Sequence, residues 1–171
     1  MKNLAVVCLA AIVLISGCGY TQKASLPRNI ESIYVETVVN SIPLDKVYAY
    51  QPGLEIDITN SILRRLEQDG NLQVVPKDQA DAILRSHLIG FEQSGVRFNQ
   101  LERVEEFRMF VILAVQLIET KTNSVIWTEP KLSGTSEYFV SDVRSIAREE
   151  GAERAVKDLA RNVVDRIVED W

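Results

Sequence analysis

The chain contains a single histidine, His87, and two cysteines, Cys8 and Cys18. Nucleophilic catalysis would need a serine or thiol, a general base and an orienting acid that converge in space. Ser86 and His87 are neighbours in a predicted strand, where a lone histidine is more often a hydrogen-bonded structural residue. The scarcity of histidine and cysteine also excludes a zinc site built from nitrogen and sulfur ligands. We therefore expect neither a metal nor another cofactor.

Two adjacent acidic pairs, Glu105-Glu106 and Glu149-Glu150, are the remaining candidates for acid–base chemistry. Neighbouring strand residues point to opposite faces of a sheet, and the second pair lies on the surface of a predicted helix. We interpret both pairs as solvated charges. The sequence also contains no glycine-rich phosphate loop, so these observations predict that the protein is not an enzyme.

Cys18 is the residue for which the sequence predicts definite chemistry. It follows an apolar run at 4–15, which is shorter than the roughly 20 residues that a membrane-spanning helix needs. With Lys2 before it and small residues after it, the run is typical of a secretory signal peptide. A buried core helix is disfavoured because the run is apolar on every side. The motif ISGC at 15–18 resembles the bacterial lipobox, whose cysteine receives an S-diacylglycerol and an N-acyl chain.

The predicted lipids imply a location for the protein. Two or more acyl chains hold a protein stably on a membrane, whereas one chain gives marginal binding. Gly19 follows the cysteine, where an aspartate would resemble an inner-membrane retention signal. The sequence thus favours a lipid anchor in the outer membrane, on its periplasmic side. It divides into a lipoprotein signal peptide (1–17), a polar lipidated tether (18–28) and a single folded domain (29–171).

The charge balance narrows the class of partner. The chain has 171 residues, with 24 acidic side chains against 19 lysines and arginines and a formal net charge of −5. A general nucleic-acid-binding protein would need a basic surface, so nucleic acid is not an expected partner. A domain of this size buries roughly 68–70% of its unfolded surface and needs no metal or disulfide to fold.

Hydrophobic periodicity predicts the elements that position these residues. In chain order they are a strand at 32–39, a helix at 54–69, strands at 71–76 and 82–91, a loop at 94–102, strands at 107–117 and 125–140, and a helix at 141–170. Pro130 lacks an amide donor and predicts a bulge or a sheet edge. Gly151 weakens the last helix by about 1 kcal/mol relative to alanine. A two-layer α+β sandwich satisfies this order, with a mixed or antiparallel sheet of about four strands and both helices on one face.

The two faces of the strand at 107–117 differ in their expected surroundings. We expect the odd-numbered face to pack against the helices, with Leu113 facing the stripe of the last helix that contains Leu159. The even-numbered face looks away from the helices, yet its middle is apolar at Phe110 and Ile112. Such a surface either contacts a partner or belongs to a central strand that is apolar on both faces or lies under a loop. The sequence leaves these interpretations open.

Basic residues near the predicted hairpins form a further pattern. They are Arg97, Arg103, Arg108, Lys121 and Lys131. The planar fork of arginine suits phosphate, because it makes paired charge-assisted hydrogen bonds. Ordinary solubilising surface charge is the simpler interpretation of any single one of them.

Several segments resemble the lipopolysaccharide-assembly lipoprotein family, LptE. They are GCGY at 17–20, LPRNIESIYVETVVN at 26–40, ADAILRSHL at 80–88, the hairpin residues VIW at 125–127, and REEGAERAVKDLARNVVDRI at 148–167. The resemblance covers nearly the whole mature chain through diffuse hydrophobic patterns, without a catalytic signature. It implies two helices against a four-stranded mixed sheet. It also implies a lipoprotein that plugs and helps assemble a large outer-membrane β-barrel, LptD, and binds lipopolysaccharide on its way to the cell surface.

This resemblance implies roles for the apolar and basic residues described above. Phe110 and Ile112 become candidate contacts with the barrel wall, and Arg97, Arg103 and Lys131 become candidates for the anionic head of the glycolipid.

A second class of function is a periplasmic lipoprotein that scaffolds or activates cell-wall enzymes. Such a protein needs a long tether, at about 3.3–3.6 Å per extended residue. Only about ten residues separate Cys18 from the first strand, and so short a tether keeps the domain near the membrane. The tether therefore favours the barrel partner.

Overall fold

The computed structural model describes residues 30–43, 52–140 and 144–168. Its elements are, in chain order, β1 (Ser32–Val35), β2 (Val39–Asn40), α2 (Leu54–Asp69), β3 (Gln73–Val74), β4 (Ala82–Phe98), β5 (Val104–Glu119), β6 (Ser124–Phe139) and α3 (Arg144–Val168). Cys18, the predicted signal peptide and the predicted tether lie outside the described residues. No helix in the described part is both long enough and apolar enough to cross a membrane.

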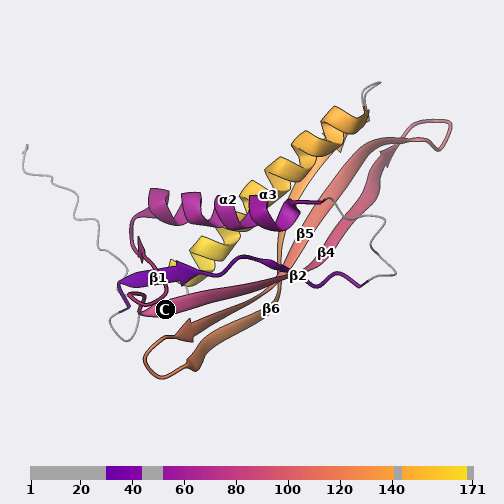
Figure 1. The fold of residues 1–171 in the computed structure, drawn as a ribbon. Coiled ribbons are helices and arrows are strands. Elements are labelled where there is room, and N and C mark those ends of the chain that lie inside the picture. The colour runs from indigo at the N-terminus through magenta and orange to yellow at the C-terminus, as the bar shows by residue number, and fades with distance from the viewer. Residues whose placement is uncertain (1–29, 44–51, 141–143, 169–171) are drawn as a thin grey trace, which may run out of the picture.

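One mixed sheet of six strands organises the domain, in the order β3-β1-β4-β5-β6, and β2 pairs with β4. The strands β4, β5 and β6 are antiparallel, while β1 runs parallel to β3 and β4. Both helices lie on the same face of the sheet (Figure 1). The predicted α+β sandwich is confirmed. The sheet has six strands where about four were expected, because the predicted strand at 32–39 is divided into β1 and β2. The short strand predicted at 71–76 is β3, which is two residues long.

The helix α2 forms where the apolar periodicity predicts it. Its buried apolar stripe consists of Leu54, Ile58, Ile62 and Leu66. Gly70 ends the helix in the left-handed region, at φ 73°, and its N–H donates to the Leu66 carbonyl at 3.0 Å. Glycine adopts this conformation without steric cost, so the end of α2 is encoded by that residue.

The strand β4 is longer than predicted, and the expected loop at 94–102 is wrong over its first half. The strand continues to Phe98. The turn follows at Asn99, whose side-chain oxygen accepts hydrogen bonds from the N–H groups of Leu101 (2.9 Å) and Arg103 (3.1 Å). Residues from Glu92 onward are mostly polar and exposed, and backbone pairing with β5 keeps them in the strand. Hydrophobic alternation therefore could not reveal this half of β4.

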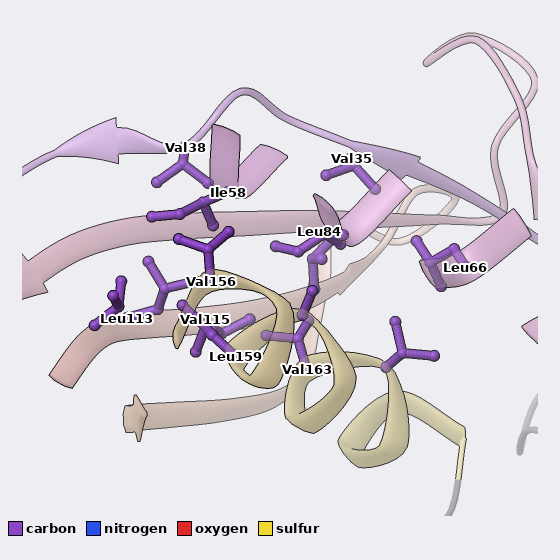
Figure 2. Packing of buried hydrophobic residues seen from close by; sticks show 14 of the residues in the cluster. Val35, Val38, Ile58, Leu66, Leu84, Leu113, Val115, Val156, Leu159 and Val163 are labelled. Atoms are coloured by element: carbon purple, nitrogen blue, oxygen red, sulfur yellow. The ribbon is translucent and has the colours of Figure 1, made fainter. Parts of the chain in front are cut away.

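The helix-facing side of β5 forms the centre of the core. Its fully buried residues are Met109, Val111, Leu113, Val115 and Leu117. Figure 2 shows Leu113 and Val115 beside Leu159 of α3, which is also fully buried. The prediction that the odd-numbered face packs against the helices is confirmed.

Two glycines allow α3 to approach its neighbours closely. A Cβ atom at Gly134 of β6 would lie 2.3 Å from the Ala155 carbonyl oxygen and the Leu159 nitrogen, so the backbone of α3 rests on the strand. A Cβ atom at Gly151 of α3 would lie 2.8 Å from the Tyr138 ring. The weak point predicted in the last helix is therefore the place where an aromatic ring packs against it.

Candidate functional site

The outer face is the side of the sheet that points away from α2 and α3, and it carries both residues predicted to contact a partner. Phe110 and Ile112 of β5 lie outside the core that the helices cover. Phe110 is half-buried between Glu92 of β4 and Thr135 of β6. Its ring therefore presents apolar surface, bordered by polar side chains, on a face that no helix of the described part covers.

Ile112 is covered more completely, with 6% of its surface exposed. It lies opposite Gly90 of β4, where a Cβ atom would come within 3.1 Å of the Ile112 Cδ1 atom. The missing side chain at Gly90 makes room for the isoleucine, so the sheet buries Ile112 without a second layer. Phe110 thus offers more surface to a partner than Ile112 does.

A second apolar surface lies at the hairpin tip, defined here as residues 96–106 of the β4–β5 hairpin together with Phe139 of β6. Figure 1 shows this hairpin extending past the end of α2. Phe98, Leu101 and Phe139 are 57%, 73% and 58% exposed. The sequence alone did not identify these residues as candidates. The available signal was the presence of large apolar residues in a stretch that is otherwise polar.

Arg97 lies on the hairpin tip and has two partners within the protein. Its Nε atom is 3.3 Å from Oε2 of Glu106, and its guanidinium lies 5.5 Å from the centre of the Phe139 ring. Glu106 is only 8% exposed. The prediction of a solvated acidic pair is therefore wrong for Glu106, although Glu105 is exposed. The strand register is the cause, because it places Glu106 between Arg97 and Phe139.

Arg103 and Lys131 lie at different places on the sheet. Arg103 closes the β4–β5 turn and is exposed. Lys131 is exposed in a bulge of β6 beside Pro130, and β6 is an edge strand, as the proline predicts. This bulge lies opposite Ala114, roughly 27 Å along β5 from the position opposite Arg97. The structure therefore brings Arg97 and Arg103 together on the hairpin tip and leaves Lys131 apart.

Charges of both signs surround the hairpin tip. Nε of Arg108 donates to Oε1 of Glu137 at 2.9 Å, and the acidic residues Glu102 and Glu105 are exposed. Arg103 has no ion-pair partner among the described residues. It is therefore the cation of the tip that is most available to a phosphate group.

The start of β1 lies at the opposite end of the sheet from the hairpin tip. The Asp81 carboxylate holds Ser32 there, accepting hydrogen bonds from its hydroxyl (2.7 Å) and its N–H (3.2 Å). The hydrogen bond from the Ser32 hydroxyl lowers the pKa of Asp81, and Lys121 of the β5–β6 turn, 3.5 Å away, also lowers it. Because β4 spans roughly 50 Å from Ala82 to Phe98, the N-terminal end of the domain is well separated from the tip.

His87 lies on the outer face beside β2, and its Nδ1 atom is 3.1 Å from the Ser41 hydroxyl. This is the hydrogen-bonded structural role that the sequence predicted. In the described part of the chain, no group of three His, Cys, Asp or Glu side chains could hold a metal ion. The groove between α2 and α3 is lined by paired charges such as Glu153 and Lys157, 2.6 Å apart. The outer face and the hairpin tip are thus the surfaces whose residue types suggest a partner.

Comparisons with known proteins agree with the resemblance seen in the sequence. A family described as "LptE: Lipopolysaccharide-assembly" matches residues 30–170. No curated protein matches the chain. Similar solved structures include a protein from Xanthomonas campestris, at 13% identity and a TM-score of 0.57, covering 81% of this chain and 84% of that one. An uncharacterized lipoprotein B from Nitrosomonas europaea has 19% identity, a TM-score of 0.51 and coverages of 85% and 88%. A minor lipoprotein from Acinetobacter baumannii has 15% identity, a TM-score of 0.52 and coverages of 81% and 92%, and at such identities these likenesses show the fold alone.

Proposed function

The chain belongs to the LptE lipopolysaccharide-assembly family, and we propose that it plugs and helps assemble an LptD-like outer-membrane β-barrel and binds lipopolysaccharide during delivery to the outer leaflet. Membership of the family supports the role in lipopolysaccharide assembly. The position of Phe110 on the outer face carries the contact with the barrel. The strand register places this residue between β4 and β6, outside the core that the helices cover, and both helices lie on the other face of the sheet (Figure 1).

The barrel contact centres on Phe110. A half-buried aromatic ring gains further burial when a second surface closes over it, and such rings are frequent anchors of interfaces. Ile112 supports the ring from the neighbouring position on the same face and contributes little area of its own. A barrel lumen with apolar and polar side chains side by side would match Phe110 and its neighbours Glu92 and Thr135.

The hairpin tip is a better candidate site for an amphiphile such as lipopolysaccharide than the surface around Lys131. Phe98 and Leu101 offer exposed apolar surface for acyl chains, and Arg103 offers an accessible guanidinium for an anionic group. Phe139 adds exposed apolar surface on the outer face of the sheet, opposite Glu106. Arg97 is a weaker candidate, because a ligand phosphate would have to compete with Glu106. Lys131 remains a separate candidate on β6.

The anchor completes the proposal. Cys18 would carry the S-diacylglycerol and N-acyl chains, with no other cofactor and no catalytic role for the domain. Residues 1–17 would be removed, residues 18–28 would form the tether, and residues 29–171 would form the domain on the periplasmic side of the outer membrane. The described part of the chain begins next to β1, and the hairpin tip lies at the far end of the sheet (Figure 1).

The experiment that tests the barrel contact is co-purification of the detergent-extracted lipoprotein with its barrel partner. We expect Phe110→Asp to weaken this association by roughly thirtyfold, as the loss of an aromatic anchor worth about 2 kcal/mol implies. Ile56→Asp is the matched control, because Ile56 is an exposed apolar residue of α2 on the opposite layer.

Two results would count against the barrel contact. If Phe110→Asp unfolds the isolated protein, Phe110 belongs to the core. If both variants retain the barrel equally well, the outer face is not the interface. Recovery of cell-wall enzymes in place of a barrel would favour the scaffolding role.

A further inference from the structure

The edge strand β6 is covered by side chains of α3, whereas the second half of β4 has no neighbouring strand on its other side in the described part. Side chains of α3 spaced one helical turn apart bond to the free backbone groups of β6. Arg154 donates to the Glu137 carbonyl (3.2 Å), Asp158 accepts from the Thr135 N–H (2.9 Å), and Asn162 donates to the Ser133 carbonyl (2.9 Å). A helix that covers an edge in this way prevents another strand from pairing there.

The edge of β4 that faces away from β5 is paired only along its first half. There β1 pairs with residues 82–84, β2 pairs with residues 87–88, and the Ser41 N–H donates to the Leu88 carbonyl at 2.8 Å. Beyond Leu88, residues 90–98 face no other strand of the described part. Backbone N–H and C=O groups on such an open edge are a template for a further strand.

We propose that this open edge of β4 pairs with the same edge of a second copy of the protein, antiparallel and with the two-fold axis at Ser94. Pairing with β5 places Glu92 on the outer face opposite Phe110, and places Arg97 on the same face opposite Glu106. Regular alternation would put residues five apart on opposite faces. The bulge between Gly95 and Arg97 moves Arg97 to the face of Glu92.

This two-fold register makes the edge self-complementary. With Val96 in the bulge, Glu92 of each copy lies opposite Arg97 of the other, and Phe91 lies opposite Phe98 on the helix-facing side. Opposite charges and paired aromatic residues at directly opposed positions stabilise a sheet. Both copies carry the bulge at equivalent places, so it supports this register where it would disturb pairing with an unrelated straight strand.

The charge pattern favours a second copy over another partner. A pairing strand must present a cation opposite Glu92 and an acid opposite Arg97, in reversed order and separated by a matching bulge. The strand β4 itself satisfies these conditions. One strand pair buries less than the roughly 1,200–2,000 Å² of a standard stable interface. The association is therefore weak and concentration-dependent.

The first test is disulfide trapping in the full-length protein in mild detergent. At the two-fold position the two Ser94 Cα atoms would lie about 4.5–5.5 Å apart, within the range that a disulfide bridges. We expect Ser94→Cys to form a covalent dimer under mild oxidation, above the background of the parent chain. Ser124→Cys, exposed at the other end of the sheet, is the matched control. Equal trapping at both positions would overturn the proposal.

The second test changes the charge at the edge of the Ser94→Cys protein. Glu92→Arg would place two cations opposite each other twice, so we expect roughly five- to tenfold less covalent dimer. Glu105→Arg makes the same change on β5, away from the edge, and is expected to leave trapping unchanged. An unchanged yield with Glu92→Arg, or an equal loss in both variants, would overturn the proposal.

Amide hydrogen exchange of the wild-type chain supplies a readout without added cysteines. We expect the backbone amides of Phe91, Gln93 and Gly95, which point away from β5 in this register, to gain protection as the protein concentration rises. Equal protection at low and high concentration would mean that this edge is not paired by a second copy, and it would overturn the proposal.

Discussion

The two faces of β5 are buried in different ways. On the inner face, Leu113 and its neighbours are fully buried beneath α2 and α3 (Figure 2). On the outer face, Ile112 is almost as well buried although no helix of the described part lies over it. Gly90 makes room for its side chain between the adjacent strands, and Phe110 on the same face is half-buried. The burial of a single side chain therefore does not show whether it belongs to the core or to an interface. The presence or absence of a covering layer of helices shows which of the two it is.

The largest expected effect tests this difference directly. We expect Leu113→Ala or Leu159→Ala to lower the free energy of unfolding by about 2–5 kcal/mol, because each leaves a cavity sealed between sheet and helices. Ile112→Ala is expected to cost only about 1–2 kcal/mol, the transfer energy of the lost atoms, since water can fill the gap on the outer face. Urea unfolding of the three variants measures these losses.

Two outcomes would break the comparison. A loss as large for Ile112→Ala as for Leu113→Ala would mean that another layer seals the outer face. A loss below about half a kilocalorie for both Leu113→Ala and Leu159→Ala would mean that the faces are reversed.

The next effect concerns the two glycines that make room for neighbours. We expect Gly134→Ala to cost about 1–3 kcal/mol, because the new Cβ atom meets backbone atoms of α3 that cannot move independently of the helix. Gly90→Ala meets the Cδ1 atom of Ile112, the end of a side chain that can rotate, so its cost should be smaller. Urea midpoints of the two variants decide the order, and a larger loss at Gly90 would show that the outer face is packed as rigidly as the inner one.

Sequence reasoning predicted the inner half of the fold well because its signals are local. Apolar residues at every second position identified β5, and the stripe that ends before Gly70 identified α2. The outer half of β4 escaped because its polar residues are held by backbone pairing with a distant segment. No alternation in the sequence of residues 92–98 records that pairing.

The candidate site was harder to predict for the same reason. Glu106 is buried because three strands in one register bring Arg97 and Phe139 to it, and bulges in β4 shift that register. The separation of Lys131 from Arg103 follows from the length of β5. Neither the contact between Glu106 and Arg97 nor the separation of Lys131 from Arg103 is encoded in a short stretch of the sequence. The lipid attachment at Cys18 stays a prediction.

A smaller effect compares two cationic positions on the surface. We expect Arg103→Glu to weaken lipopolysaccharide binding about three- to tenfold at low salt, because it removes an accessible guanidinium at the apolar hairpin tip. Lys131→Glu makes the same charge change on β6 and serves as the control. Binding of purified protein to lipopolysaccharide at two salt concentrations measures both. A larger loss with Lys131→Glu would move the glycolipid site from the tip to β6, and no loss in either would leave both as ordinary surface charge.

The smallest effect returns to the two faces at adjacent residues of β4. Ser86 points to the inner face and is 1% exposed, and its hydroxyl has no hydrogen-bond partner among the described residues. His87 points to the outer face and is hydrogen-bonded to Ser41. A buried hydroxyl without a partner keeps its desolvation cost, so we expect Ser86→Ala to raise the free energy of unfolding by up to about 1 kcal/mol. Ser41→Ala removes the partner of His87 and is expected to lower it by about half a kilocalorie. If Ser86→Ala instead destabilises the protein in urea, the hydroxyl is satisfied and the inner face of the sheet is less dry than its apolar lining implies.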